Sequence, residues 1–289
     1  MKRVPYPLAR CSTTDTDDLL RRPRQIQLTS FNTGEVLVPR GGVFNLRHPA
    51  AQDLAHETMW VPVYAHLVQH AQQGSYLIDA GLDSSFARLP YGSMRGLLVR
   101  LLACQCRQSR GQDIASRLAE RKVKLRGVFF THLHFDHIAG AAGLPSKLDY
   151  VAGAGEWYIN IPGILSCNHL RHINMLRQMD LTDAPALGML GPASDIFGDG
   201  SLWAIHTPGH TPGHISFFIN GQERQVLVAG DAIMLRANLE RGIGGGSFCL
   251  NRQKAQLSQD RLSAFIRKYP KVQVVFGHEL PPAAGKASA

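Results

Sequence analysis

Apolar positions in the first quarter of the chain follow the two-residue period of β-strands. Residues 26–37 have β-strand composition around the turn signal Asn32-Thr33-Gly34. Residues 59–69 alternate between the two faces of a strand, and Pro62 among them indicates a sheet edge or a bulge. A turn at residues 73–75 leads into the short apolar run 76–78. We therefore predict an antiparallel β-meander over about the first eighty residues.

Helical and strand-like segments follow one another through the rest of the chain. Apolar residues at helical spacing predict helices over residues 93–108, 113–124, 156–161, 169–179 and 258–269. Short apolar runs predict strands over residues 203–207, 214–219, 225–229 and 272–276, with a hairpin at Asn220-Gly221. Residues 188–200 are expected to form a loop. Residues 236–249 are expected to form a mobile loop, since their glycine run 242–246 lacks the ending of a phosphate-binding loop.

The order of these elements suggests an α+β fold. Strands, helices, strands, a helix and a strand fall into two halves, which suits two packed β-sheets with helices outside, a four-layer αβ/βα sandwich. No linker is evident, so residues 25–289 are expected to form one domain. Residues 1–24 are polar, charged and punctuated by proline, which predicts a loosely ordered N-terminal arm.

Composition and charge narrow the function classes. The 289 residues are 44% hydrophobic, which is enough for a sizeable core. The formal net charge is +9, and a basic balance can indicate nucleic acid, a membrane surface or an anionic substrate. However, no block of five Lys or Arg residues and no aromatic-basic stretch occurs. The sequence therefore favours a basic enzyme with a small-molecule substrate over a nucleic-acid or membrane partner.

Cysteine usage and the N-terminal sequence bear on the compartment. The five cysteines form no CxxC pair and no plausible disulfide framework, and Cys104 and Cys106 are expected to be reduced core thiols. No signal-peptide apolar region is present, and no apolar run reaches the length of a membrane span. We therefore expect a cytoplasmic protein.

Residues 131–140 concentrate four potential metal ligands. His132, His134, Asp136 and His137 directly follow an apolar run that predicts a buried strand. An extended backbone places His132 and His134 on one face, and the following turn can aim the other two at a second point. Imidazole and carboxylate groups together suit zinc, iron or manganese, with zinc the default.

Three further ligand candidates lie at or just past the ends of later strands. His210 occupies a Thr-Pro-Gly-His turn, Asp231 ends an apolar strand, and His278 follows the last strand. A carboxylate such as that of Asp231 can bridge two cations. Because several strand ends can converge at one edge of a sandwich, these residues are expected to share a cleft with the first cluster.

HxHxDH, Thr-Pro-Gly-His, Gly-Asp-Ala and Gly-His in this order resemble the metallo-β-lactamase superfamily, over residues 76–278. The resemblance implies that fold and a dinuclear site. It places one cation between His132, His134 and His210, the other between Asp136, His137 and His278, and Asp231 as the bridge. It also places Asp79 behind the site. His206 and His214 are expected either to orient ligands by hydrogen bonds or to pack in the core. The remaining histidines are expected to be structural: His48, His56, His66, His70, His169 and His172.

A dinuclear site predicts hydrolysis by a metal-bound hydroxide, with Asp136 as a proton carrier to the leaving group. Among the branches, the chain resembles the N-acyl homoserine lactonases. It lacks the cysteine ligand and export signal of true β-lactamases and the added domains of glyoxalase II-like and ribonuclease Z-like enzymes. A lactone or ester is therefore the expected substrate. A phosphodiesterase, a thioesterase and a metal-bearing binding protein remain alternatives.

One position departs from the lactonase pattern. Those enzymes commonly carry a tyrosine three residues after the bridging aspartate, where this chain has Met234. Methionine cannot donate the hydrogen bond to a substrate carbonyl that the tyrosine provides. Met234 and Phe248 are candidate contacts for an acyl chain, with ordinary core packing as the alternative.

Overall fold

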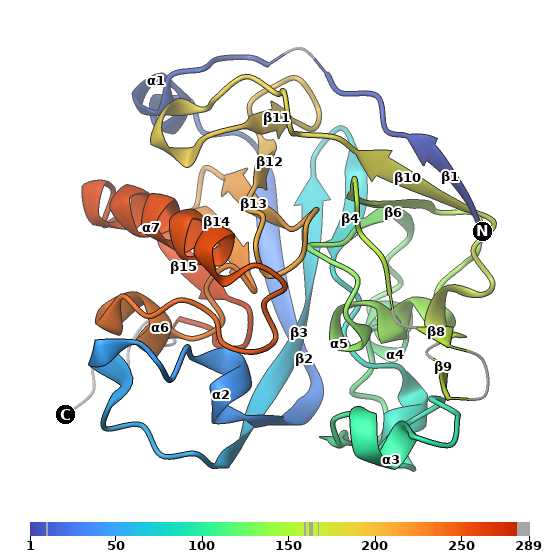
Figure 1. Ribbon diagram of the computed structural model, residues 1–289. Helices are drawn as coiled ribbons and strands as arrows, with labels where there is room; N and C mark the ends of the chain where they lie inside the picture. The colour runs from blue at the N-terminus through green and yellow to red at the C-terminus, as the bar shows by residue number, and fades with distance from the viewer. Residues whose placement is uncertain (10, 159, 162–163, 167, 282–289) are drawn as a thin grey trace.

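Two β-sheets pack face to face in the computed structural model, which describes residues 1–9, 11–158, 160–161, 164–166 and 168–281 (Figure 1). The larger sheet has the order β1 (Lys2–Pro5), β10 (Met175–Met179), β7 (Asp149–Gly153), β6 (Leu125–Phe129), β4 (Gly74–Ile78), β3 (Thr58–His70), β2 (Ile26–Pro39) and β5 (Cys106–Arg107). The smaller sheet has the order β11 (Ala193–Asp195), β12 (Leu202–His206), β13 (Ile215–Asn220), β14 (Gln225–Gly230) and β15 (Gln273–Phe276). A separate hairpin joins β8 (Asn160–Ile161) to β9 (Leu165–Ser166).

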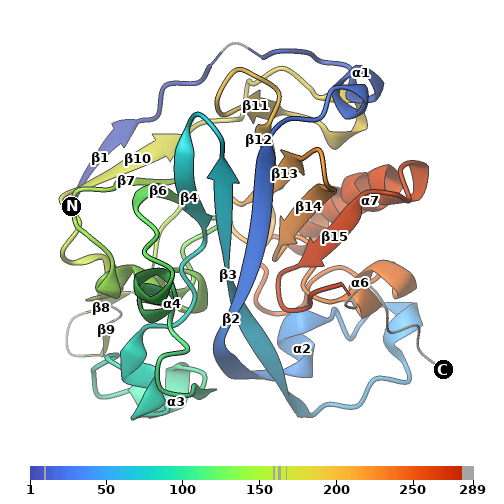
Figure 2. The ribbon, with the colours of Figure 1, turned by 180° about the vertical axis from the view of Figure 1, so that it is seen from behind.

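Helices cover the outer faces of both sheets (Figures 1 and 2). The α-helices are α1 (Thr16–Arg21), α2 (Arg40–Val43), α3 (Val99–Leu102), α4 (Ile114–Glu120), α5 (Phe135–Ile138), α6 (Arg236–Arg241) and α7 (Arg252–Lys268). Short 3-10 turns occur at Pro49–Ala51, Ser84–Ala87, Ala139–Gly143, Asn168–Leu170 and Gly188–Leu190. Among the described residues, no helix combines the length and apolar content of a membrane span.

Three apolar layers hold the sandwich together. Between the sheets, side chains such as Phe129 of β6 and Phe217 of β13 pack against each other. Outside the smaller sheet, Phe218 meets Phe265 of α7 edge to face with ring centroids 5.8 Å apart. Outside the larger sheet, α4 buries Leu118 against the strands. These layers confirm the predicted αβ/βα sandwich.

The predicted meander is also present. Strands β2, β3 and β4 pair antiparallel in sequence order. The turn signal at Asn32-Thr33-Gly34 forms a bulge inside one continuous strand, where Gly34 has φ +141°. Pro62 lies opposite Glu35, beyond the segment of β3 that pairs with β4. That side of β3 is a local sheet edge, which a proline tolerates because it has no N–H to donate.

Three predicted helices are wrong. Residues 93–108 contain only the four-residue α3 and the strand β5, because Gly92 and Gly96 adopt positive φ (+53° and +130°) and break the helical path. In residues 156–161, the described part ends in the β8 strand. In residues 169–179, the last five form β10, which pairs with β1 and β7. Pairing with distant strands decides these segments, and local periodicity does not report it.

Two predicted loops contain regular structure. Residues 188–200 include the β11 strand, and residues 236–249 begin with α6, which ends at Gly242 in the left-handed conformation (φ +65°). Regular structure also occurs within residues 1–24, where we expected a loosely ordered arm. The β1 strand pairs parallel with β10, and Asp15 caps the N-terminus of α1.

Candidate metal centre

The predicted ligands meet at one edge of the sandwich, where four strands end. The strand β6 is followed by His132, His134, Asp136 and His137, the last two on α5. His210 lies in the turn between β12 and β13. Asp231 directly follows β14, and His278 comes two residues after β15. Gly230 has φ +54°, and a Cβ added there would lie 2.9 Å from Nε2 of His214, so the turn before Asp231 needs glycine.

The seven residues form two adjoining groups of ligand atoms. Within each group the atoms lie within 4.8 Å of one another. The first group contains His132, His134, His210 and Asp231. The second group contains Asp136, His137 and His278. The structure therefore brings together every residue for which the sequence predicted a ligand role.

The Asp231 carboxylate lies between the two groups. Its Oδ2 atom is 3.3 Å from Nε2 of His210 and 3.9 Å from Nε2 of His132. Its Oδ1 atom is 3.5 Å from Nε2 of both His137 and His278. One oxygen thus faces each group, which is the arrangement of a carboxylate that bridges two cations.

Hydrogen bonds on the far side of the rings orient two of the histidines. The Nδ1–H of His137 donates to Oδ2 of Asp79 at 2.7 Å, and that of His278 donates to the carbonyl of Pro62 at 2.9 Å. Because both acceptors lack a proton to give, Nδ1 carries a hydrogen in each ring, and Nε2 is the nitrogen directed at the centre.

Unpaired buried atoms show that the donor set suits metal ions. Among the described residues, Nε2 of His132, Nε2 of His137 and Oδ1 of Asp231 are buried without a hydrogen-bond partner. Such atoms cost free energy unless another partner satisfies them. Five imidazoles and two carboxylates supply nitrogen and oxygen donors of the type that zinc, iron and manganese accept.

The charges of the side chains are strongly coupled. Burial raises the pKa of the Asp231 carboxyl, but His278, His210 and His137 outweigh it and hold that pKa well below its ordinary value. Burial lowers the pKa of His137, whereas the carboxylates of Asp79, Asp136 and Asp231 outweigh that effect and raise it to about 10. The Asp231 carboxylate is thus ionised at neutral pH and available as a ligand.

Asp79 supports the site from behind, as the resemblance implied. It is buried with φ +58°, and it accepts the backbone N–H and the hydroxyl of Thr131, both at 2.8 Å. The Thr131 hydroxyl also lies 3.0 Å from Nδ1 of His132. Asp79 therefore contacts one ligand directly and a second one through Thr131.

His214 and His206 differ in their roles. His214 is buried, accepts the backbone N–H of Asp231 at 3.0 Å and contacts the Thr207 hydroxyl at 2.8 Å through its other nitrogen. Burial lowers its pKa to about 3, so the ring stays neutral. His206 is half-buried and makes only a 3.5 Å contact to the Pro212 carbonyl. Hydrogen-bonded orientation thus describes His214, and packing describes His206.

Glu156 holds two ligand-bearing loops, a role that sequence reasoning missed. It is fully buried, and its two oxygens accept the backbone N–H of Leu133 at 3.0 Å and of Gly213 at 2.9 Å. Arg3 of β1 donates to the Glu156 carbonyl at 2.6 Å. The only sequence signal was an acidic residue among small ones, and it fell within a predicted helix.

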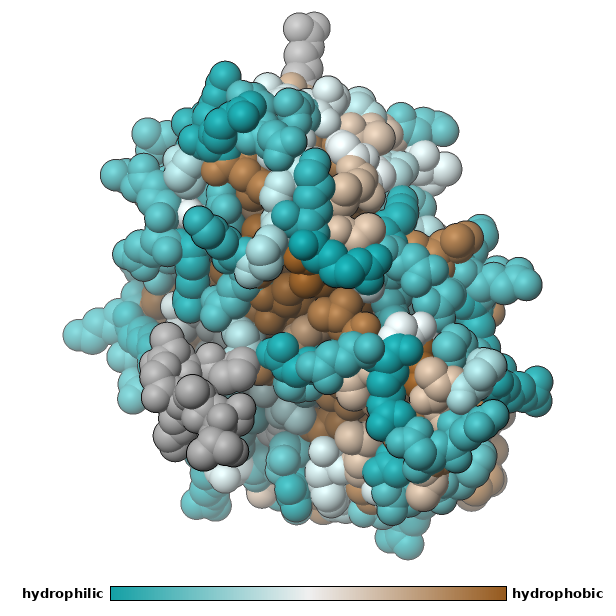
Figure 3. All heavy atoms as spheres, turned by 90° about the vertical axis from the view of Figure 1, so that its left-hand side faces the viewer, coloured by the Kyte–Doolittle hydropathy of each residue, from teal (hydrophilic) through white to brown (hydrophobic). Residues whose placement is uncertain are grey.

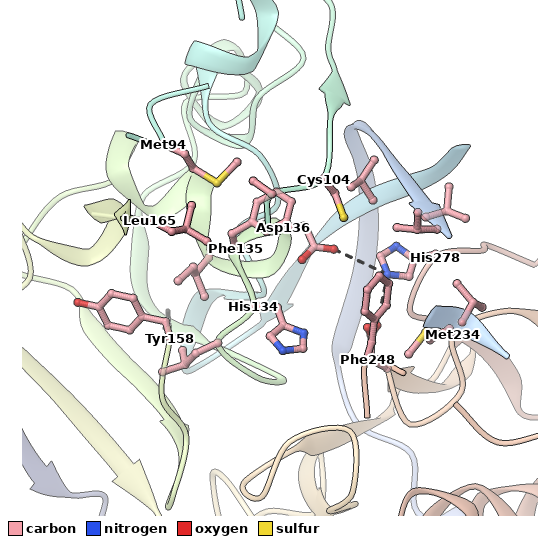
Figure 4. A pocket seen from close by; sticks show the side chains of 18 residues that line it. Met94, Cys104, His134, Phe135, Asp136, Tyr158, Leu165, Met234, Phe248 and His278 are labelled. Carbon is pink, nitrogen blue, oxygen red and sulfur yellow. Dashed lines mark ion pairs between the residues drawn. The ribbon is translucent and has the colours of Figure 1, made fainter. Parts of the chain in front are cut away.

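A mostly apolar pocket with a cavity volume of about 170 Å³ opens onto the ligands (Figure 4). Met234 and Phe248 both line it, as predicted. Met94, whose segment was also expected to suit an acyl chain, lines it too. Several pocket residues carried no functional expectation: Val36, Val38, Val61, Cys104, Phe135, Tyr158 and Leu165. Cys104, expected in the core, lies at the pocket wall, where burial raises the pKa of its thiol to about 11.

Comparison with known proteins matches this chain to one family model and to several relatives. The family model of the metallo-beta-lactamase superfamily matches residues 58–278. An N-acyl homoserine lactonase from Bacillus sp. is 26% identical over 238 residues, which cover 79% of this chain and 86% of that protein. The metallo-hydrolase mfmC of Annulohypoxylon moriforme is 26% identical over 168 residues, and the chain spans only 42% of its length.

Solved structures show the same fold. A B. thuringiensis AiiA mutant with N-decanoyl-L-homoserine bound at its active site superposes with a TM-score of 0.66 at 20% identity. The superposition covers 89% of this chain and 94% of that one. AidC, a dizinc quorum-quenching lactonase with N-hexanoyl-L-homoserine as product, superposes with a TM-score of 0.58 at 16% identity, covering 90% of each chain.

Proposed function

Because this chain belongs to the metallo-beta-lactamase superfamily, we propose that it is a dinuclear metal-dependent hydrolase that opens N-acyl homoserine lactones or related apolar lactones and esters. The observation that carries the proposal is the position of Asp231. Its two oxygens face separate imidazole groups at 3.3–3.9 Å, as a carboxylate shared by two cations requires. The named lactonase relatives support the choice of substrate class.

The proposed ligand assignment follows the two groups of atoms. His132, His134 and His210 would hold one cation, Asp136, His137 and His278 the other, and Asp231 both. When bound, zinc, iron or manganese ions supply a water that is acidic enough to ionise near neutral pH and polarise the scissile carbonyl. Asp79, Thr131 and His214 keep the ligands in position through the hydrogen bonds described above.

Asp136 is the proposed proton carrier. Its side chain lines the pocket, and its Oδ2 lies 3.7 Å from Nε2 of His137 and 3.8 Å from Nε2 of His278. One oxygen can therefore serve the ligand set while the other faces the leaving group. Asp136 would accept the proton that the attacking water loses and pass it to the leaving alkoxide, which would complete ring opening.

The pocket wall supports an apolar acyl group in the substrate. Met234, Phe248, Val38 and Leu165 surround the space beside the ligands. In Figure 4 the Tyr158 ring lies across the cavity from Met234, with its hydroxyl directed away from the His134 ring. No donor in the labelled set therefore takes the place of the tyrosine that lactonases commonly carry, and substrate orientation would rest on the cations and on apolar contact.

The test is hydrolysis by the metal-reconstituted protein of an acyl-homoserine lactone series, a thioester and a bis(aryl) phosphodiester. Metal content is measured in parallel by mass spectrometry. The proposal expects lactone opening to be fastest, with two cations per chain. If lactones stay closed while the phosphodiester or the thioester turns over, the lactonase assignment fails. Turnover of none of them by the metal-loaded protein would favour a binding protein.

Asp231→Asn provides the site-directed test, with the exposed Asp260→Asn as its matched control. An amide oxygen is a weaker metal ligand than a carboxylate oxygen, and asparagine has only one oxygen, so it cannot offer one to each cation. We expect Asp231→Asn to lose at least one cation and at least about 100-fold in kcat. Asp260→Asn should retain both cations and full rate. Retention of both cations and full rate by Asp231→Asn would refute the shared-carboxylate assignment.

A further inference from the structure

The corner of the molecule formed by α3 and the β8–β9 hairpin exposes large apolar side chains. Figures 1 and 2 place these elements together, away from α7. The exposed fractions are Leu97 87%, Leu101 76%, Leu89 51%, Trp157 50%, Ile161 48% and Ile164 41%. We call this surface the α3–hairpin face. Isolated exposed leucines are ordinary, whereas a cluster of six large apolar side chains indicates an interaction surface.

Backbone hydrogen bonds join the two parts of the α3–hairpin face. The N–H of Leu98 donates to the carbonyl of Ile164 at 3.0 Å. Arg95 and Ser166 exchange two backbone bonds, at 2.7 and 3.1 Å. The two segments that carry these exposed side chains therefore lie side by side.

The same surface is basic. Residues 84–112 contain five arginines and no acidic residue, and of these Arg107 pairs with Glu35. Arg88, Arg95 and Arg100 are exposed and, within the described part of the chain, form no ion pair. The sequence pattern does not reveal this patch, because the arginines are dispersed among apolar residues and form no contiguous block.

The proposed substrate pocket adjoins the α3–hairpin face. Met94, from the segment before α3, Tyr158, before the hairpin, and Leu165 of β9 line the pocket. The elements that form the surface thus also form one wall of the pocket. A partner on this face would lie close to the route by which an apolar substrate enters.

We propose that the α3–hairpin face docks reversibly on an anionic lipid surface. Leu97, Leu101 and Trp157 would enter the interfacial layer of the bilayer, and Arg88 and Arg100 would pair with lipid phosphates. Apolar side chains flanked by unpaired arginines match the apolar interior and negative headgroups of such a surface. A two-fold dimer through this face would instead set arginine against arginine without acidic partners.

This interaction is independent of the reaction that the pocket performs. Binding by a few leucines and arginines is peripheral and weakens as salt screens the charges. Docking would bring the pocket wall to the lipid surface, where molecules with long acyl chains concentrate. The inference therefore extends the proposed function and stands without it.

The test is co-sedimentation of the metal-loaded protein with lipid vesicles at about 0.1 M salt. One set of vesicles is phosphatidylcholine alone, and the other contains roughly 30% phosphatidylglycerol to supply negative charge. We expect binding to the mixed vesicles, weak binding to phosphatidylcholine, and loss of binding at about 1 M salt. If the protein binds neither kind of vesicle, the proposal is overturned.

Leucine substitutions separate this face from others. The double variant Leu97→Ser, Leu101→Ser should bind mixed vesicles at least about tenfold more weakly. Leu257→Ser is the matched control, since Leu257 is 64% exposed on α7. The side that carries α6 and α7 is covered mainly by hydrophilic side chains around a central hydrophobic area (Figure 3). Equal losses in the test and control variants would overturn the proposal.

Charge substitutions test the second half of the interaction. Arg88→Gln and Arg100→Gln should each weaken binding about fivefold. The control Lys254→Gln, Arg267→Gln removes two exposed charges from α7 and should bind like the parent protein. Light scattering distinguishes docking on lipid from association with a second copy of the chain. A dimer that Leu97→Ser, Leu101→Ser converts to a monomer, without vesicle binding by the parent, would assign the face to a second copy.

Two further readouts exclude indirect effects. The substituted side chains are exposed, so the thermal unfolding midpoint of each variant should match that of the parent. Hydrolysis in vesicle-free buffer should also be unchanged, because none of these side chains lines the pocket. Loss of vesicle binding with intact hydrolysis supports docking, and hydrolysis measured alone decides the proposed function separately.

Discussion

The Nε2 atom of His214 accepts the backbone N–H of Asp231 at 3.0 Å, which fixes the residue whose two oxygens face both ligand groups. Both partners are buried, so the bond is shielded from water. A side chain of similar volume that lacks a hydrogen-bond acceptor would leave the backbone N–H of Asp231 unpaired. The position of the bridging carboxylate therefore depends on a histidine that itself does not belong to the ligand groups.

His214→Phe should destabilise the protein by about 1–3 kcal/mol, the cost of leaving a buried donor unpaired. Metal affinity should fall as well, because the turn that carries Asp231 loses its support. Urea unfolding and metal titration measure the two effects. His206→Phe, on the half-buried neighbour, should change stability by less than about 0.5 kcal/mol. Equal effects of the two substitutions would contradict this role for His214.

Glu156→Ala should destabilise more than Glu156→Gln. Alanine leaves the N–H groups of both Leu133 and Gly213 unpaired, whereas the single amide oxygen of glutamine can accept one of them. We expect losses of about 2–5 kcal/mol for alanine and about half of that for glutamine. Chemical denaturation gives the stability. Calorimetric metal binding should weaken in the same order, and an unchanged metal affinity in both variants would refute the positioning role.

His66 should make the protein sensitive to acid. Its ring is buried, contacts the Ser30 hydroxyl at 2.8 Å, and has a pKa lowered by burial from 6.5 to about 3. The unfolded chain takes up a proton below pH 6.5 and the folded chain does not until about pH 3. Stability is therefore fully present above pH 6.5 and lost as the pH falls toward 3.

The measurement compares denaturant unfolding at pH 7 and pH 5 in the parent protein and in His66→Gln. Between these values the parent should lose about 2 kcal/mol more than the variant. His56→Gln, at an exposed position, should follow the parent. Parallel losses in the parent and in His66→Gln would show that another group causes the acid sensitivity.

Phe248 should set the response to acyl-chain length. Its ring lines the pocket and packs so close to Gly42 that a Cβ there would lie 2.5 Å from it. Phe248→Ala should lower kcat/KM for a decanoyl substrate about tenfold or more by removing apolar contact. A butanoyl substrate, too short to use that contact, should be affected little and is the internal control. Equal losses for both chain lengths would place Phe248 in the core and not at the substrate.

Chelation should reveal how far the metal centre supports the fold. The unpaired buried atoms of His132, His137 and Asp231 would gain partners when ions bind. Removal of metal with a chelator should lower the thermal unfolding midpoint, and added zinc should restore it in a concentration-dependent way. The variant Asp231→Asn should show a smaller response. An identical midpoint with and without the chelator would argue against metal binding by these residues.

Local spacing in the sequence determined the cluster of four ligands in residues 131–140 and the outline of the fold. His132, His134, Asp136 and His137 lie within six residues at the end of one strand, so a strand, a turn and a short helix suffice to bring them together. The meander was equally predictable, because alternation of apolar residues reports which face of a strand is buried. For His210, Asp231 and His278, the family resemblance supplied the pairing that local pattern does not contain.

Only the tertiary structure decided the features that depend on distant partners. Residues 175–179 form a strand because β1 and β7 lie on either side of them, and the same periodicity fits a helix. The clamp by Glu156 joins Leu133 to Gly213, 80 positions further along the chain, and no local pattern encodes that contact. The division of the Asp231 oxygens between the two ligand groups likewise arises where strand ends from both halves of the sequence meet. Sequence periodicity reports burial, whereas long-range pairing and hydrogen bonding exist only in the folded chain.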